Sequence, residues 1–300
     1  MSNLSHIFQE LAYMVHRITL KLNPRIEMAR CYHKIFGVFP NFKEPKSLIE
    51  KVYWLQLNAD TSLWSLCADK YRVRDYVFEK GLGHYLNELY GVWENENDIE
   101  FAKLPSQCVL KTTNGCGQTL FYDRSIPNSD DLAKKQLGKW LRHPFGVSGG
   151  ELHYLRIKPR IIAEKLIPIP EGEVSLTDYK FWCFDGEPFC ILVVYNRKDT
   201  TVNLALYDLN WNPMLQYLKS TKHAICDPNA SISKPESLDE MIRLAEILSR
   251  GFPEVRVDLY EIEKKPFFGE MTFSTGFGYF TDDFYRILGD KVVLQKENRR

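Results

Sequence analysis

The residues from Val255 to Gly278, VRVDLYEIEKKPFFGEMTFSTGFG, are the stretch that decides the fold class and the search for a site. Apolar side chains alternate with polar ones over residues 255–260, and more apolar residues follow the charged segment 263–266. This pattern predicts two short strands joined by a turn. Because successive side chains of a strand point to opposite faces, Arg256 and Asp258 share one face of the first strand.

Glu270 and Thr272 share one face of the second strand for the same reason. Two carboxylates and a hydroxyl on one side of a β-ribbon suit Mg²⁺, which takes oxygen ligands, accepts one or two carboxylates and keeps water and phosphate oxygens. The alternative is a solvated hairpin face without a function, and the ribbon alone favours that alternative. The rest of the chain must decide between them.

The bulk composition limits the classes of function. The chain has 300 residues, which suffices for two domains or for one domain of several lobes. Its 39 basic and 39 acidic residues balance, so no global field attracts nucleic acid, and an anion site must be local. The seven cysteines form no C-x-x-C pair and, with the histidines, show no zinc spacing. Such dispersed cysteines predict reduced thiols in a cytoplasmic protein.

The N-terminal segment has apolar side chains at helical spacing over residues 5–23, interrupted by Glu10, His16, Arg17 and Lys21. It therefore predicts an amphipathic helix and neither a signal peptide nor a membrane-spanning segment. We expect the apolar side of this helix to face the core, and binding to a membrane surface is the alternative.

The remaining secondary structure follows from cap residues, apolar spacing and turn residues. Helices are expected within residues 1–60 with a capping box at Ser47–Glu50, over residues 70–80 with Asp69 as the cap, from Ser129 to Leu141, and from a cap at Ser237–Glu240 to Gly251. Strands are expected over residues 108–110, 119–122, 160–167, 178–184, 188–195 and 202–208, with a turn at Asp185-Gly186 and a linker between lobes at residues 167–172. Helices mixed with mostly antiparallel strands predict an α+β fold.

The turn KTTNGCG, residues 111–117, lies between two of these expected strands. Its glycines allow backbone N–H groups to approach phosphate oxygens, and Lys111 supplies a positive charge at the strand end. Asn114-Gly115 is equally an ordinary type I′ hairpin turn, and the spacing matches neither a P-loop nor a dinucleotide fingerprint. The motif by itself therefore leaves both interpretations open.

Five segments in order resemble the ATP-grasp superfamily, and its TupA-like branch most closely. They are CADKYRVRDYV (67–77), CVLKTTNGCG (108–117), PRIIAEKL (159–166), TDYKFWCFDGEP (177–188) and VRVDLY…FFGEMTFSTGFG (255–278), and the resemblance covers roughly residues 30–290. It implies an ATP-grasp fold in which two α+β lobes clasp a nucleotide, with a helical N-terminal extension. The implied divisions are a helical region (1–60), a connecting helical region before the ATP lobes (61–105), a small lobe with a glycine-turn lid (106–167) and a large lobe with the metal site (168–300).

The resemblance also implies a role for individual residues. The implied ATP-binding residues are Arg74 and Lys111 on the phosphates, Asn114, Gly115, Cys116 and Gly117 in the lid turn, Glu164, Lys165 and Leu166 at the adenine hinge, and Asp178 on the ribose. The implied Mg²⁺ ligands are Asp258, Glu270 and Thr272, and Arg256, Lys180 and Arg197 are the implied catalytic cations. Thr272 stands where the family usually has asparagine, so we expect weaker or altered binding of a second metal ion.

The function implied by the resemblance is an ATP- and Mg²⁺-dependent ligase. It would activate a carboxylate as an acyl phosphate and transfer it to an amine, or to a thiol or hydroxyl. The setting implied is bacterial surface polysaccharide, capsule or teichuronopeptide synthesis, with a sugar acid or amino acid as substrate and a peripheral association with glycan-assembly machinery. No nucleic acid and no integral membrane segment is expected.

Three alternatives stay open beside the ligase. They are a glycosyltransferase of polysaccharide synthesis, a non-catalytic module that binds nucleotide or glycan, and a kinase that stops at phosphoryl transfer. No nucleotide-sugar motif is present for the first, and the set of Lys111, Asp258 and Glu270 argues against the second. Cys116 is interpreted as a turn residue and not as a nucleophile, because no histidine lies near it in the sequence.

Overall fold

The structure is a computed structural model that describes residues 3–143, 145–147, 149–198, 200–274 and 278–294. Its contacts divide the chain into two compact units. Unit 1 contains Met1–Lys43, Gln56–Tyr71 and Glu88–Leu166, and unit 2 contains Glu44–Leu55, Arg72–Asn87 and Ile167–Arg300. Each unit combines helices with its own sheet, so the predicted α+β class is confirmed.

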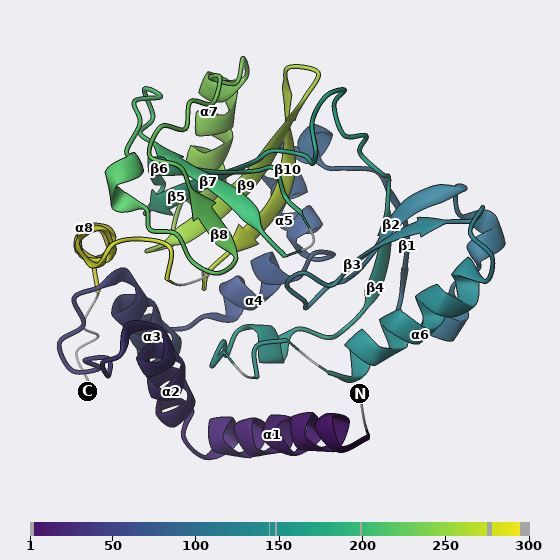
Figure 1. Ribbon diagram of the computed structural model, residues 1–300, viewed down its shortest axis with the longest axis horizontal. Coiled ribbons are helices and arrows are strands. Elements are labelled where there is room, and N and C mark those ends of the chain that lie inside the picture. The colour runs from purple at the N-terminus through teal and green to yellow at the C-terminus, as the bar shows by residue number, and fades with distance from the viewer. Residues whose placement is uncertain (1–2, 144, 148, 199, 275–277, 295–300) are drawn as a thin grey trace. The chain divides into compact units, whose positions relative to one another are not determined.

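Unit 1 is built on a four-stranded antiparallel sheet in the order β1–β4–β2–β3. Helix α6 runs along this sheet and contacts β2 and β3 (Figure 1). Leu110 and Ala163 from the strands and Leu137 from α6 are fully buried in one apolar cluster. The elements of this unit are α1 (Asn3–Leu22), α2 (Pro24–Phe36), α4 (Ser62–Ala68), α6 (Ser129–Arg142), β1 (Leu89–Trp93), β2 (Gln107–Thr112), β3 (Thr119–Asp123) and β4 (Ile161–Glu164).

Unit 2 is built on a six-stranded sheet in the order β10–β9–β5–β6–β7–β8. All neighbours in this sheet are antiparallel except β7 and β8. Helix α7 contacts β5, β6 and β9 on one face of the sheet (Figure 1). The elements are α3 (Leu48–Asn58, in this unit up to Leu55), α5 (Val73–Glu79), α7 (Leu238–Ser249), α8 (Asp282–Lys291), β5 (Asp178–Phe184), β6 (Glu187–Tyr195), β7 (Val202–Tyr207), β8 (Ala224–Cys226), β9 (Val255–Ile262) and β10 (Lys265–Thr272).

Strand alternation separates an apolar face from a polar face in this larger sheet. Phe181, Val257 and Leu259 are completely buried, as a face covered by a helix requires. The residues between them in sequence, such as Lys180 and Asp258, project from the opposite face. The sheet therefore presents its charged side chains together on one side.

The predicted capping box at the start of α3 is confirmed in both of its hydrogen bonds. The Ser47 N–H donates to Glu50 Oε2 at 3.0 Å, and the Glu50 N–H donates to Ser47 Oγ at 3.4 Å. The predicted turn Asp185-Gly186 is also confirmed, because both residues have positive φ, 50° and 88°.

The predicted cap at Asp69 is wrong. Asp69 follows α4, a helix that the sequence interpretation missed, and the next helix begins only at Val73. The Asp69 carboxylate instead accepts the Tyr71 N–H at 2.9 Å and pairs with Arg160 at 3.4 Å. An aspartate that pairs with a distant arginine can stand in the same local sequence as an aspartate that caps a helix. The sequence pattern therefore could not distinguish the two roles.

The predicted side-chain cap at Ser237 is also wrong, although α7 does start there. The Ser237 hydroxyl and its N–H both donate to Glu261 Oε2 on β9, at 2.6 and 2.7 Å. The hydroxyl thus ties the helix start to the sheet and makes no hydrogen bond to the first turn. A tertiary contact has replaced a local one.

Several strand predictions need smaller changes. The expected strand 160–167 is shorter and spans only Ile161–Glu164, and strands β1 and β8 were not anticipated. The type I′ alternative at Asn114-Gly115 is wrong, because in this turn only Gly117 has a positive φ, 68°.

The expectation that α1 turns its apolar side to the core is wrong as well. Phe8, Leu11, Val15, Ile18 and Leu22 are all exposed. In the part of the chain that the structure describes, no helix has the length and apolar character to cross a bilayer.

Candidate functional site

The ribbon β9–β10 places the predicted metal ligands side by side. Asp258 lies opposite Glu270, and Arg256 lies opposite Thr272, so all four side chains share one face. The turn between the strands consists of Glu263 and Lys264, both with positive φ. Residues 275–277, at the end of this motif, lie outside the described residues.

A β-bulge at Gly269 makes this pairing possible. Phe268 lies opposite Leu259 but Glu270 lies opposite Asp258, so Gly269 is the extra residue. With an unbroken ladder Glu270 would lie opposite Val257, on the face that α7 covers. A Cβ at position 269 would come within 2.9 Å of the Asp258 carbonyl oxygen, which explains why glycine occupies this position.

Asp258 is the centre of a buried ionic network. Arg256 donates from Nε to Asp258 Oδ1 at 2.6 Å and from Nη2 to Oδ2 at 2.7 Å, and Lys180 on β5 also donates to Oδ2. The side chains of Asp258 and Arg256 are only 2% and 9% exposed. Arg256 further donates to Thr272 Oγ1 at 3.2 Å and lies 3.6 Å from Glu270.

The network extends to Asp178 at the start of β5. Lys180 Nζ lies 3.6 Å from Asp178 Oδ2, and Arg197 donates to the same oxygen at 2.7 Å. Burial raises the pKa of the Tyr260 hydroxyl well above its usual value, and the charge of Asp178 and a hydrogen bond to it add to the rise. Tyr260 is therefore a neutral hydrogen-bond donor beside this carboxylate.

The charges of this network cancel. Asp178, Asp258 and Glu270 carry three negative charges, and Lys180, Arg197 and Arg256 carry three positive charges. Burial opposes the charge on Arg256, but Asp258 and Glu270 outweigh it and keep its pKa well above the ordinary value. By formal charge the network is neutral as a whole.

The donor set of this face fits a magnesium ion. Asp258 and Glu270 offer two neighbouring carboxylates, and the Thr272 hydroxyl, which donates to Glu270 Oε1 at 3.3 Å, lies beside them. Glu270 is 36% exposed and is the more accessible of the two acids. Among the described residues no cluster of three His, Cys, Asp or Glu side chains is arranged to hold a metal. Two carboxylates and one hydroxyl suit an ion that fills its remaining positions with water and phosphate.

In unit 1 the predicted phosphate lysine and hinge glutamate contact each other. Lys111 Nζ donates to Glu164 Oε2 at 2.8 Å, and Lys111 is 28% exposed. Both lie on paired strands, β2 and β4. Lys165 and Leu166 follow Glu164 directly, and the Lys165 N–H donates to the Glu88 carbonyl at 2.9 Å.

The predicted lid turn follows Lys111 in the same unit. Lys70 holds the turn from outside it, because its Nζ donates to the Gly115 carbonyl at 2.8 Å and its N–H to the Thr113 carbonyl at 3.0 Å. Cys116 is exposed, whereas Asn114 is 1% exposed, and its side-chain oxygen and nitrogen find no hydrogen-bond partner in the described structure. A buried amide without partners is costly unless it meets another polar group.

Arg74 is the second residue that the sequence predicts on the phosphates. It lies on α5 in unit 2, and its guanidinium donates to the Asn87 carbonyl at 2.7 Å. Its proposed role on the phosphates stays a prediction.

The sequence interpretation missed residues around the network. Trp182 lies opposite Arg256 on β5, and the guanidinium carbon lies 5.4 Å from the centre of its ring. Glu254 is completely buried, and neither of its carboxylate oxygens has a hydrogen-bond partner in the described structure. Burial raises the pKa of Glu254 to about 8, against the opposing effect of Arg256. In the sequence, only the position of Trp182 on β5 and of Glu254 directly before β9 indicated that these residues lie near the network.

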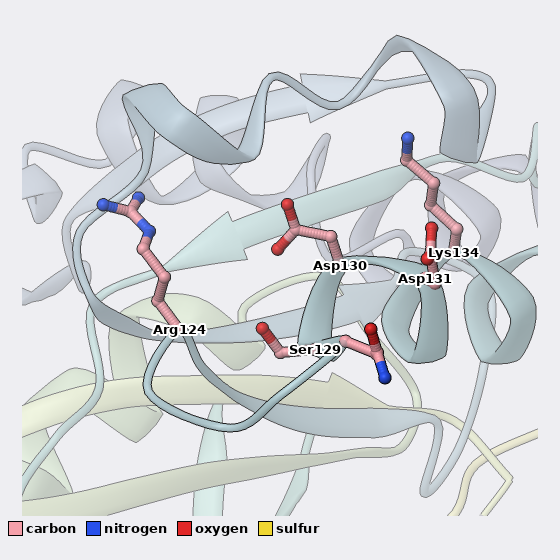
Figure 2. A pocket seen from close by; sticks show the side chains of 6 residues that line it. Arg124, Ser129, Asp130, Asp131 and Lys134 are labelled. Carbon is pink, nitrogen blue, oxygen red and sulfur yellow. The ribbon is translucent and has the colours of Figure 1, made fainter.

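A hollow of about 400 Å³ elsewhere in unit 1 contains none of the predicted residues. Figure 2 shows its lining, with Arg124 on one side and Ser129, Asp130, Asp131 and Lys134 at the start of α6. Asp130 accepts a hydrogen bond from Tyr122 at 2.7 Å, and Arg124 donates to the Phe101 and Leu104 carbonyls. Asp130 and Arg124 are thus engaged by neighbouring protein groups, and we assign the hollow no role.

Comparisons with known proteins add the following findings. A family model described as TupA-like ATP-grasp matches residues 50–293. Similar solved structures include a D-alanine–D-alanine ligase from Bacillus anthracis complexed with ATP, with 16% identity over 76% of this chain and 65% of that one, and a TM-score of 0.42. The ATP-grasp ligase PsnB, complexed with a variant of its minimal precursor, Mg and ADP, has 12% identity over 82% and 65%, and a TM-score of 0.42. The chain thus spans about two thirds of their length, and no curated protein sequence matches it.

Proposed function

Because the chain belongs to the TupA-like ATP-grasp family, we propose that it is an ATP- and Mg²⁺-dependent ligase that joins a carboxylate to an amine. The observation that carries this proposal is the buried, neutral network around Asp258, with Glu270 placed opposite it by the bulge. A solvated hairpin face would have no reason to bury three ionised side chains, because desolvation of charge is costly. The ribbon is therefore better explained as a site.

When bound, ATP with Mg²⁺ would supply a phosphoryl group to the substrate carboxylate with release of ADP, and attack of the amine on the resulting acyl phosphate would form the amide and release inorganic phosphate. Catalysis of this kind depends on positioning and charge neutralisation. Asp258 and Glu270 would hold the metal, and Thr272 would hold it or a bound water. Lys111 and the lid turn would bind phosphate, Glu164 to Leu166 the adenine, and Asp178 the ribose.

The neutrality of the network predicts how Mg²⁺ binds to it. A bare divalent cation would add two uncompensated charges to a buried neutral group, which low-dielectric surroundings oppose. Phosphates bound together with the ion would cancel this excess, and Asp258 would then hold the metal while Lys180 and Arg256 would supply positive charge to the phosphate oxygens. We therefore propose that Mg²⁺ binds this face together with the nucleotide and only weakly alone.

The acceptor chemistry is proposed on the family setting alone. A sugar acid or amino acid of a bacterial surface polysaccharide would be the carboxylate, and an amine the acceptor. Arg197 is 53% exposed and already binds a carboxylate, that of Asp178, so it is suited to contact such a substrate.

The test begins with binding and ends with turnover. Millimolar ATP with Mg²⁺ should raise the melting temperature, and Mg²⁺ alone should not. Phosphate release should require both a carboxylate and an amine. In Asp258→Asn and Glu270→Gln the release should fall about a hundredfold or more, the effect of removing one electrostatic group worth about 3 kcal/mol. Glu236→Gln, which alters an exposed ion pair with Lys264 in the same unit, is the matched control.

Each alternative gives a different result in this assay. Nucleotide binding without turnover would indicate a binding module, and phosphate transfer that needs no amine would indicate a kinase. Transfer from a nucleotide sugar without ATP would indicate a glycosyltransferase. Folded Asp258→Asn protein with full turnover would contradict the assignment of the metal site.

A further inference from the structure

Helix α1 presents an apolar stripe to solvent. The stripe consists of Phe8, Leu11, Met14, Val15, Ile18 and Leu22, each between 53% and 81% exposed. Their spacing of three and four residues places them along one side of the helix. Single exposed apolar residues are ordinary, but six on one face of one helix mark an interaction surface.

The opposite side of α1 holds the helix to the rest of unit 1. Leu20 is buried, His16 Nδ1 lies 3.1 Å from Glu27 Oε2 on α2, and the Tyr13 ring lies 5.4 Å from that of His143. Figure 1 shows α1 joined end to end with α2. Because the mixed polar face makes these contacts, the apolar stripe is turned outward and has no cover in the described structure.

The charge around the stripe is positive although the whole chain is neutral. Residues 1–43 contain six Lys and Arg against two acidic residues, a net charge of +4, so the remainder carries −4. One of the two acids, Glu27, is buried and paired with Arg30 at 2.5 Å. Arg17 and Lys21 are exposed and follow Met14 and Ile18 by three residues, which places them along one margin of the stripe.

We propose that α1 is an interfacial helix that binds the surface of an anionic phospholipid bilayer. An apolar face with basic residues at its margin is the composition of helices that lie in the plane of a membrane. A helix of 20 residues is about 30 Å long, enough for all six apolar side chains to enter one leaflet. A second copy of this chain is the less suitable partner, because two surfaces of the same positive charge would meet.

The experiment uses the full chain and two kinds of vesicle. Co-sedimentation with vesicles of phosphatidylglycerol and phosphatidylcholine should deplete the protein from solution, and pure phosphatidylcholine should do so several times less. Ile18→Asp and Leu11→Asp should each lower the partition coefficient about tenfold, because each removes one apolar side chain from the interface. Arg17→Gln with Lys21→Gln should lower it on anionic vesicles only, about fivefold per charge.

The controls separate this proposal from a fold defect and from the ligase. Val174→Asp alters an apolar residue of similar exposure, 53%, in unit 2 and should bind vesicles as the wild type does. The stripe variants should melt at the wild-type temperature and keep wild-type nucleotide binding, since their side chains face solvent. Equal sedimentation of wild type and Ile18→Asp would overturn the proposal. A concentration-dependent dimer that Ile18→Asp dissociates, without vesicle binding, would overturn it in favour of a second copy.

Discussion

The predicted site residues of unit 1 and unit 2 are held in opposite ways. In unit 1, Lys111 and Glu164 form one ion pair with the lysine 28% exposed. In unit 2, Arg256, Asp258 and Lys180 form a network in which no side chain is more than 12% exposed. A partly exposed pair exchanges partners at little cost, whereas a buried network keeps its geometry because separation leaves an unpaired charge. The larger sheet therefore supplies rigid positioning, and the smaller sheet supplies an adaptable charge.

The largest difference should show in the dependence of stability on pH. Glu254 of unit 2 has its pKa raised by burial, from 4.5 to about 8, so the folded protein keeps a proton that the unfolded chain releases. The stability it contributes is present below pH 4.5 and is lost as the pH rises to about 8. The loss is on the order of 5 kcal/mol. Urea unfolding at pH 5 and pH 8.5 measures this loss, and Glu254→Gln should remove it. If the free energy of unfolding of Glu254→Gln changes between the two pH values as much as that of the wild type, the prediction is contradicted.

His153 of unit 1 should act at the other end of the pH range. Burial, assisted by Arg156, lowers its pKa from 6.5 to about 3. The neutral imidazole therefore contributes stability that is present above pH 6.5 and lost as the pH falls toward 3, again on the order of 5 kcal/mol. His153→Gln should flatten the acid limb of the stability curve in urea unfolding and leave the alkaline limb intact. A variant that flattens both limbs would show that the two units do not titrate separately.

Removal of one cation from each cluster tests the comparison directly. Arg256→Met leaves Asp258 buried with Lys180 alone and should lower the free energy of unfolding by about 3–5 kcal/mol. Lys111→Met should lower it by about 1 kcal/mol or less, because that pair is partly solvated. Both are measured by urea unfolding at pH 7, with the exposed Lys264→Met as the control. Equal losses in the two variants would remove the distinction between the clusters.

The bulge glycine of unit 2 and a turn glycine of unit 1 should also differ. The new Cβ of Gly269→Ala would meet the Asp258 backbone oxygen at 2.9 Å, which cannot move aside without shifting the strand. We expect a loss of about 1–3 kcal/mol in stability, together with weaker binding of ATP with Mg²⁺. In Gly115→Ala the Cβ meets side-chain atoms of Gln118 and Thr112, which can rotate away, so the loss should be smaller. Thermal melts with and without nucleotide measure both, and a larger loss for Gly115→Ala would refute the bulge argument.

The smallest expected effect concerns the lid turn. Lys70→Met removes the hydrogen bond from Nζ to the Gly115 carbonyl, which is worth about 1 kcal/mol. Amide hydrogen exchange over residues 113–118 should become about fivefold faster, and exchange in β9 and β10 should not change. Nucleotide should slow exchange in the same turn of the wild type. Protection that appears elsewhere and never in this turn would remove its phosphate-binding role.

The ribbon could be predicted because its signals are local. Alternation along β9 placed Arg256 and Asp258 on one face, and the Asp185-Gly186 turn has residues that tolerate positive φ. The capping box at Ser47 formed because donor and acceptor are three residues apart. In each case the partners that decide the structure lie within a few residues of each other.

The rest depended on partners that are distant in sequence. Asp69 and Ser237 looked like helix caps, but Arg160 and Glu261 engage them. The bulge at Gly269 could be predicted only from the register of β10 against β9, although a glycine inside a strand pattern indicates that a bulge can occur. The direction of α1 was misjudged because amphipathic spacing shows that a helix has an apolar side and does not show what covers it.

The bulge at Gly269 divides the β9–β10 hairpin into two segments that can be edited separately. Residues between the bulge and the tip at Glu263 and Lys264 pair in a regular ladder, so the tip can be lengthened by whole pairs of residues without changing which side chains face the network. Exposed turns are also the positions where insertions are best tolerated. A fluorescent reporter inserted between Glu263 and Lys264 would therefore extend from the same two strands that carry Asp258 and Glu270. The pairing register of these two residues would stay unchanged.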